Sequence, residues 1–252
     1  MTSINGHCLH MEVHGPTDAP TVVLLHHGLG SVYSWQAQIP ALVAAGYHTI
    51  AYDRWGYGHS DAREQFSMPY FEDDLRDLEA ILDLVQAQRV ALVGHSDGGT
   101  IALYYAARLA RQITAVVPVA AHIYVEPKML PGMEGVKRAY ENDPNFRQGL
   151  RRLHSDKVDM VFRGWYEGWR KPENLDWDMR SSLKKISCPA LVIQGLEDEH
   201  AAPQHARDIA AAIPDASLWL VPEVGHMLPQ DFSGEFNARL CAFLDEWFAI
   251  ER

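Results

Sequence analysis

RVALVGHSDGGT, residues 89–100, is an apolar run that breaks into a Gly-x-Ser-x-Gly pattern and then continues as a helix-forming segment. This pattern is typical of a nucleophile elbow, in which a serine occupies a strained turn between a strand and a helix. Only small residues two positions before and after the serine let the chain fold back closely, and Gly94 and Gly98 hold those positions. The stretch therefore predicts that Ser96 is a nucleophile above the carboxyl edge of a sheet, followed by a helix over residues 100–110.

A second loop is expected to complete an oxyanion hole with the elbow. The helix after Ser96 directs its first amides at the serine, so the Asp97 amide is one predicted donor. The other comes from a glycine-rich loop after a buried strand at residues 21–25, and Gly28 is the first choice for it. Leu29 is the second choice, because the sequence does not fix which amide faces inward. His26 is expected to order this loop by hydrogen bonding.

Composition bounds the class of protein. The chain has 252 residues, 47% hydrophobic and 22% charged, which fits one large globular domain with a full core. A formal net charge of −11 and the absence of a long basic cluster argue against a nucleic-acid partner. No apolar run reaches the ~20 residues of a membrane span. The three cysteines are widely spaced and odd in number, which indicates a reducing compartment. We therefore expect a cytoplasmic protein with no membrane partner.

Buried strands alternate with helical segments along most of the chain. This alternation predicts parallel βαβ units in a mostly parallel, doubly wound sheet. Asn5-Gly6 predicts an N-terminal antiparallel pair, and the glycine turn 53–60 is expected to rim the active-site edge. The acidic run 72–74 is interpreted as the solvated first turn of a helix. The expected strands are 21–25, 47–52, 90–93, 113–119, 188–195 and 217–221, and the other expected helices are 35–45, 72–86, 203–212 and 232–247.

The alternation stops over residues 122–182, which are rich in charge and aromatic side chains. We interpret this segment as a helical cap, inserted late into a core of residues 1–121 and 183–252. It begins at the carboxyl end of a strand, where open α/β sheets bind ligands. Phe162, Trp165 and Trp169 share one helix face and are the expected substrate-binding residues of the cap, although packing as cap core is an equal alternative.

The other two members of a catalytic triad are expected in late loops. Glu197, Asp198 and Glu199 follow the strand 188–195, and composition alone cannot choose among these acids. His226 follows the last strand and is well placed to reach a serine above the same sheet edge.

These motifs, in the order Ser96, Asp198, His226, resemble the α/β-hydrolase superfamily across nearly the whole chain. The closest likeness is to small-capped serine esterases, including the valacyclovir-hydrolase-like group with its Ser-Asp-Gly-Gly elbow. The resemblance selects Asp198, because the family acid stands three residues after the strand-ending glycine. One departure is His26-His27, where many relatives have a single His-Gly. Serine at the elbow, where haloalkane dehalogenases carry aspartate, argues against dehalogenation.

The resemblance implies acyl transfer through an acyl-enzyme on Ser96, with no metal or organic cofactor. The expected substrates are small to medium carboxylic esters or lactones. Two alternatives remain: the same triad serves C–C bond hydrolysis or peroxyacid formation, or the fold is a small-molecule receptor that retains the triad. The sequence does not define the oligomeric state.

Overall fold

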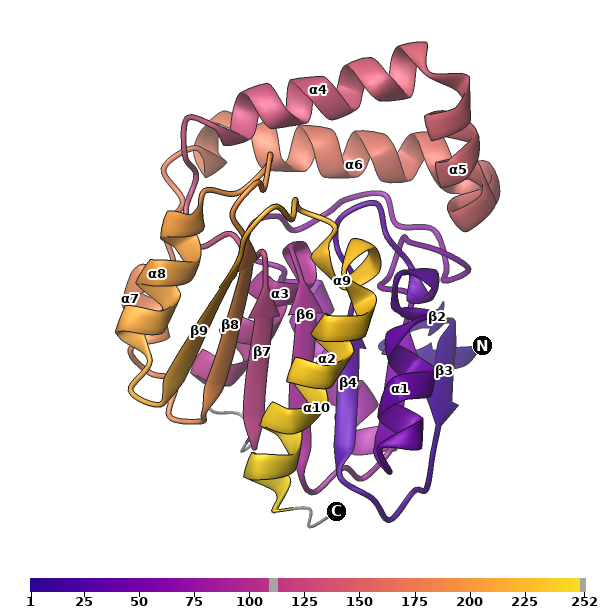
Figure 1. The fold of residues 1–252 in the computed structure, drawn as a ribbon. Helices are drawn as coiled ribbons and strands as arrows, with labels where there is room; N and C mark the ends of the chain where they lie inside the picture. The colour runs from indigo at the N-terminus through magenta and orange to yellow at the C-terminus, as the bar shows by residue number, and fades with distance from the viewer. Residues whose placement is uncertain (109–112, 250–252) are drawn as a thin grey trace.

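A seven-stranded sheet forms the centre of the protein in the computed structural model, which describes residues 1–108 and 113–249 (Figure 1). Its strand order is β3-β5-β4-β6-β7-β8-β9, and only the edge strand β3 runs antiparallel to its neighbour. A separate antiparallel pair, β1 and β2, flanks the turn at Asn5-Gly6, as predicted. The strands are β1 (Thr2–Ile4), β2 (His7–Leu9), β3 (Met11–His14), β4 (Thr21–Leu25), β5 (His48–Tyr52), β6 (Val90–His95), β7 (Ala115–Val119), β8 (Ala190–Gly195) and β9 (Ala216–Val221).

Helices cover both faces of the sheet, so the predicted doubly wound α/β architecture is confirmed (Figure 1). Strands β4 to β8 are buried along their whole length, which explains the apolar runs at residues 22–25, 90–93, 115–119 and 190–193. Residues 109 and 110 of the predicted elbow helix lie outside the described residues. One face carries α1 (Gln38–Ala44), α9 (Leu228–Asp231) and α10 (Ser233–Phe248), and the other carries α2 (Glu72–Leu84), α3 (Asp97–Arg108), α7 (Arg180–Leu183) and α8 (Pro203–Ala212).

A helical layer lies across the carboxyl end of the sheet, between β7 and β8 in the chain (Figure 1). We call α4 (Met129–Asn142), α5 (Pro144–His154) and α6 (Val158–Arg170) the cap helices. They match the predicted helical insertion in place and type, whereas the division into a core of residues 1–121 and 183–252 and a cap of residues 122–182 stays a prediction.

The two ends of this insertion are hydrogen-bonded to each other. Tyr124 and Asp178 form an antiparallel bridge, the Val125 amide donates to Trp177 O at 3.1 Å, and the Met179 amide donates to Ile123 O at 2.8 Å. We call this short ladder the neck. It holds the start and the end of the insertion side by side, above the neighbouring strands β7 and β8.

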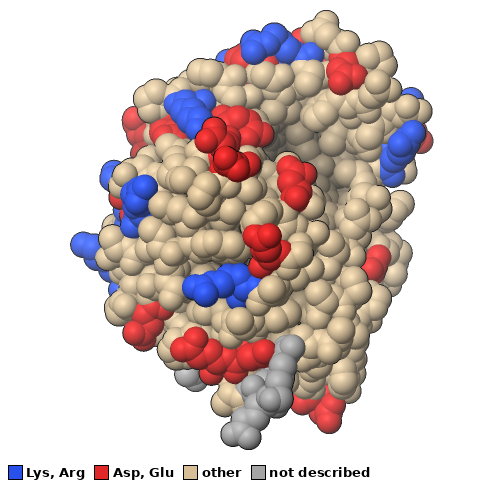
Figure 2. All heavy atoms as spheres, viewed as in Figure 1, with Lys and Arg blue, Asp and Glu red and all other residues tan. Residues whose placement is uncertain are grey.

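Charge is scattered over the face of the molecule that Figure 2 shows. On the face shown in Figure 2, lysine and arginine side chains stand among acidic and uncharged residues and form no continuous basic patch. Within the described ranges, no helix is both long and apolar enough to cross a bilayer.

Candidate active site

The elbow has the geometry that its glycines predict. Ser96 lies between β6 and α3 with φ of 54°, a left-handed conformation that is costly for a serine. A Cβ at Gly94 would overlap the backbone of Gly98, and a Cβ at Gly98 would overlap the carbonyl group of Leu25. Both glycines are therefore required for the close approach of α3 to β4 and β6.

Asp198 and His226 form a buried pair at the carboxyl ends of β8 and β9. His226 Nδ1 donates to Asp198 Oδ2 at 2.8 Å. The same oxygen accepts from Gln194 Nε2 at 2.6 Å, and Asp198 Oδ1 accepts from the amides of His200 and Ala201 at 2.7 and 2.8 Å. Burial alone would raise the pKa of Asp198, but His226 and these amides lower it below its ordinary value. The carboxylate is thus ionised and fully hydrogen-bonded.

Further groups hold the His226 loop in place. His95, the residue before the candidate nucleophile, donates from Nε2 to His226 O at 2.8 Å. Glu199 Oε2 accepts from the His226 amide at 3.1 Å, and the His200 ring lies edge-on to the His226 ring with centroids 4.8 Å apart. Sequence reasoning missed His95 and Gln194. Their only signal is a polar residue at the end of an otherwise apolar strand.

The loop that holds Gly28 and Leu29 follows β4 and closes against the elbow. Leu29 has φ of 63°, and a Cβ at Gly28 would overlap the Trp165 indole and approach Asp97 Oδ2 at 2.9 Å. His26 orders this loop as expected: its Nδ1 donates to His27 O at 2.8 Å and its Nε2 accepts from the Arg54 amide at 3.0 Å. Gly28, Leu29, Ser96 and Asp97 all line one cavity.

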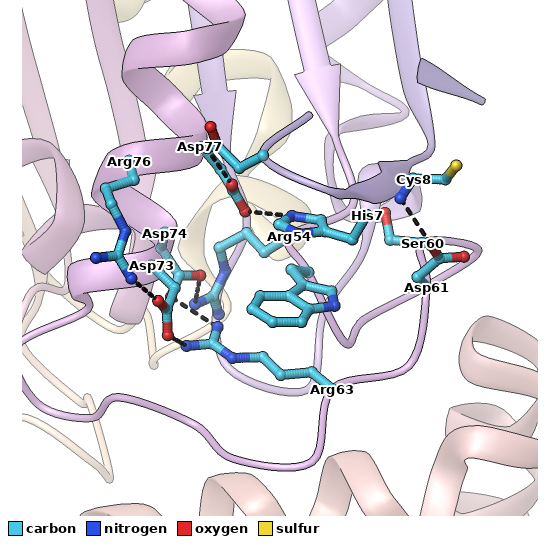
Figure 3. Close-up of polar contacts among 12 residues, drawn as sticks. His7, Cys8, Arg54, Ser60, Asp61, Arg63, Asp73, Asp74, Arg76 and Asp77 are labelled. Atoms are coloured by element: carbon cyan, nitrogen blue, oxygen red, sulfur yellow. Dashed lines mark hydrogen bonds and ion pairs between the residues drawn. The ribbon is translucent and has the colours of Figure 1, made fainter. Parts of the chain in front are cut away.

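A buried charge network supports the elbow from below. Arg54 contacts the Asp97 carboxylate at 3.4 Å. Figure 3 shows the rest of the network, in which Arg54 contacts Asp74 at 3.2 Å and Arg63 contacts Asp74 at 3.0 Å and Asp73 at 2.6 Å. The interpretation of the acidic run 72–74 as a solvated turn is therefore wrong for Asp74, which is only 3% exposed. Arg54 of the glycine turn and Arg63, three residues after that turn, supply two guanidinium groups that compensate for the burial of this carboxylate.

The cavity has a volume of about 470 Å³ and lies between the sheet edge and the cap helices. Ser96 and His226 contribute to its floor, and its carboxylates are those of Asp97 and Glu199. Among the described residues that line it, none is a lysine or an arginine. The cap helices supply an apolar wall of Met129, Met133, Val136, Phe146, Leu150, Leu153, Trp165 and Trp169.

The predicted aromatic stripe of α6 divides between the cavity and the cap interior. Trp165 and Trp169 line the cavity, and Trp169 Nε1 donates to Asp97 Oδ1 at 3.2 Å. Phe162 is not among the described lining residues. It stacks instead on Tyr140, with centroids 3.9 Å apart and ring planes within 4°. The methionine and leucine positions of the wall were not predicted, because their periodicity is that of any amphipathic helix.

Buried histidines make the stability of the fold sensitive to acid. Burial lowers the pKa of His122 from the ordinary 6.5 to about 3 and that of His205 to about 4. Below pH 6.5 the unfolded chain therefore binds protons that the folded chain does not, and stability is lost as the pH falls. Linkage gives a loss of about 2 kcal/mol per histidine between pH 7 and pH 5, or about 4 kcal/mol for the pair.

Urea unfolding at pH 7, 6 and 5 measures this loss. A His122→Gln variant keeps a donor toward His200 O, which His122 Nε2 contacts at 3.2 Å, but cannot titrate. Between pH 7 and pH 5 the free energy of unfolding of this variant should fall by about 2 kcal/mol less than that of the wild type. A wild-type free energy of unfolding that stays constant over this range would contradict the prediction.

The described residues include no group of three or more His, Cys, Asp or Glu side chains arranged to hold a metal ion. The assembled features are those of a hydrolase: a strained serine at an elbow, a histidine hydrogen-bonded to an ionised aspartate and a shared cavity at the carboxyl edge of a parallel sheet. Residues 22–239 match the model of the alpha/beta hydrolase family, and the chain belongs to this family.

Curated relatives carry hydrolase names. The chain is 31% identical to serine hydrolase BPHL of Homo sapiens over 93% of its own length and 82% of that protein. It is 30% identical to the putative carbamate hydrolase RutD of Variovorax paradoxus, covering 94% of this chain and 96% of that one. The crystal structure of the enol-lactonase from Burkholderia xenovorans LB400 superposes with a TM-score of 0.77 at 24% identity, covering 96% and 98% of the two chains. At this level of sequence identity, the likeness to the enol-lactonase concerns the fold alone.

Proposed function

We propose that the protein is a serine hydrolase that cleaves small to medium uncharged carboxylic esters or lactones through an acyl-enzyme on Ser96. The observation that carries the proposal is the hydrogen bond from His226 to the ionised Asp198 carboxylate, beside a strained elbow serine in one cavity. Such a pair is needed to activate a hydroxyl that is a weak nucleophile on its own.

The proposed reaction gives each of these groups one role. A neutral His226 ring that donates from Nδ1 to Asp198 has no proton on Nε2, and this nitrogen takes the proton of Ser96. The Ser96 oxygen attacks the substrate carbonyl, and the resulting oxyanion is stabilised by the Asp97 amide and by the Gly28 or Leu29 amide. His226 then protonates the leaving alcohol. Water, activated by the same histidine, hydrolyses the acyl-enzyme and restores Ser96.

The cavity wall supports the choice of substrate class. The side chains above the serine are methionine, leucine, phenylalanine and tryptophan, which favour an apolar acyl or alkyl group. Asp97 is paired with Arg54, whereas the Glu199 carboxylate in the wall, with no lysine or arginine among the described lining residues, disfavours an anionic substrate. A volume of about 470 Å³ accommodates a short or medium ester more readily than a long-chain lipid.

The alternatives make different predictions for purified protein. A receptor that retains the triad would bind p-nitrophenyl esters without turnover. An enzyme specialised for C–C bond hydrolysis or peroxyacid formation would turn them over far more slowly than a 1,5-diketone, or would need hydrogen peroxide as the acyl acceptor. Steady ester turnover in buffer alone, faster than that of a 1,5-diketone, distinguishes the proposed function from all of these.

A chain-length series from p-nitrophenyl acetate to palmitate tests the size of the cavity. We expect kcat/KM to be largest below about eight acyl carbons. The mono-p-nitrophenyl ester of succinic acid should be a much poorer substrate than the pentanoate of similar length. A maximum at twelve carbons or longer would contradict the enclosed cavity.

Trp165→Ala should move this optimum toward longer chains, because the indole lines the cavity next to Gly28. Phe162→Leu is the matched comparison on the same helix. It should lower thermal stability, since Phe162 packs on Tyr140, and leave the chain-length profile unchanged. An unchanged profile in Trp165→Ala would assign this side chain to the cap interior.

A further inference from the structure

Three consecutive carbonyl oxygens of the loop after β4 each accept a hydrogen bond from a histidine ring. His26 Nδ1 donates to His27 O at 2.8 Å, and His27 Nδ1 donates to Gly28 O at 2.5 Å. The third ring comes from a cap helix: His154, the last residue of α5, donates from Nε2 to Leu29 O at 2.9 Å. The loop that carries the candidate oxyanion amides is thus held both by two of its own histidine rings and by a histidine of the cap helix α5.

The tautomer of His154 follows from its second contact. Its Nδ1 accepts a hydrogen bond from the Gly58 amide at 2.9 Å, so the proton of the neutral ring is on Nε2, toward Leu29. The side chain is fully buried, and this burial lowers its pKa below the ordinary value, which keeps the ring neutral at neutral pH. His154 therefore connects α5, the glycine turn and the candidate oxyanion loop through fixed hydrogen bonds.

We infer that His154 is a positioning residue for the oxyanion hole, supplied by the cap rather than by the sheet domain. Leu29 is in the left-handed region, where a leucine is strained and needs external contacts to stay. Because C=O and N–H point in opposite directions across a trans peptide, holding the carbonyl groups of His27 and Gly28 turns the amides of Gly28 and Leu29 away from those rings. The bond from His154 fixes the next carbonyl and so completes the conformation of Leu29.

The inference rests on the proposed function, since an oxyanion hole matters only if a tetrahedral intermediate forms. Loss of the His154 bond lets Leu29 relax and moves an oxyanion donor away from the reacting carbonyl. Removal of one such donor lowers kcat by about 10²- to 10³-fold in serine hydrolases. A displaced donor should cost less, so we expect about a 10- to 100-fold loss of kcat with KM changed by less than about threefold.

Two substitutions separate the two hydrogen bonds of the ring. In His154→Asn the side-chain amide occupies the position of Nδ1, so it can accept from Gly58 but cannot reach Leu29. In His154→Gln the amide reaches the position of Nε2, so it can donate to Leu29 O but no longer accepts from Gly58. Each variant loses one buried hydrogen bond, and their thermal stabilities should fall alike. Only the asparagine variant should show the loss of kcat with p-nitrophenyl butyrate.

A tetrahedral adduct provides a readout that depends on the oxyanion hole. Butylboronic acid binds serine hydrolases as such an adduct, so its affinity should fall in His154→Asn by the same factor as kcat/KM and stay near wild type in His154→Gln.

Lys157→Met is the control for docking of the cap. Lys157 Nζ donates to Tyr57 O at 3.1 Å and to Ser60 O, and has no bond to the loop at Gly28 and Leu29. This variant should keep wild-type kcat and boronate affinity.

Equal losses in the asparagine and glutamine variants, or a loss of kcat in Lys157→Met as large as in His154→Asn, would overturn the inference. If neither His154 variant folds, the imidazole N–H resonance of His154 in the ¹H–¹⁵N spectrum of the wild type decides. This resonance should shift when butylboronic acid binds, and an unchanged resonance rejects the positioning role of His154.

A fully active Ser96→Ala variant would instead reject the proposed function. An inactive Ser96→Ala with equally active His154 variants rejects only the role of His154.

Discussion

Ser96→Ala should lower kcat/KM for p-nitrophenyl butyrate by at least about 10⁴-fold. The substitution removes only the hydroxyl that the proposed mechanism uses as nucleophile, and alanine tolerates the same turn between Gly94 and Gly98 about as well as serine does. Steady-state kinetics with the purified variant measure the loss, and its melting temperature should stay within a few degrees of the wild type.

Covalent labelling provides the control for this prediction. A fluorophosphonate should add its mass to the wild-type peptide that contains Ser96 and to no peptide of the alanine variant. If the variant kept a tenth of wild-type activity, Ser96 would not be the nucleophile and the proposed mechanism would be wrong.

Asp198→Asn should cost about 10⁴-fold in kcat, an effect second only to that of Ser96→Ala. The groups that contact this carboxylate are all donors: His226 and Gln194 on one oxygen, and the amides of His200 and Ala201 on the other. An asparagine NH₂ therefore meets a donor in either orientation. If it faces His226, the imidazole must take the tautomer with its proton on Nε2, which cannot accept the proton of Ser96. A pH–rate profile and kcat measure the effect.

The neighbouring acids supply matched controls for Asp198. Glu199→Gln should change kcat by less than about threefold, because its amide oxygen can still accept from the His226 amide. Glu197 is exposed, and Glu197→Gln should have no larger effect. A severe loss at Glu197 together with a mild loss at Asp198 would reject the assignment of the triad acid.

Most secondary structure was predictable because it depends on local pattern. The continuous apolar sequences of β4, β6 and β8 could be recognised without any knowledge of their neighbours, and the small residues at Gly94 and Gly98 have a purely steric reason. Helix α8 spans the predicted residues, Pro203–Ala212, because proline at its first position marks where it begins. Boundaries elsewhere shifted by a few residues, as for α1, which starts only at Gln38 after a 3-10 turn at Val32–Trp35.

The parts that could not be predicted depend on contacts between distant segments. Asp74 has the same sequence surroundings as an exposed helix-start acid, and only its ion pairs with Arg54 and Arg63 make it a buried residue. Nothing in the sequence around His154 indicates a contact with Leu29, which lies 125 positions earlier in the chain. Likewise, the helical periodicity placed Phe162 on the same face as Trp165, but could not show that Tyr140 of α4 would cover it.

The neck at Tyr124 and Asp178 makes this molecule suited to the construction of chimaeras. Since its two sides are hydrogen-bonded partners beside the paired strands β7 and β8, we expect these strands to keep their separation when the segment between Tyr124 and Asp178 is exchanged for one of another length. The proposed catalytic groups would then stay in place while the apolar wall of the cavity is replaced. A transplanted segment must still provide equivalents of His154 and Trp169, the cap side chains bonded to Leu29 and Asp97. These contacts set the minimum that an exchanged cap has to preserve.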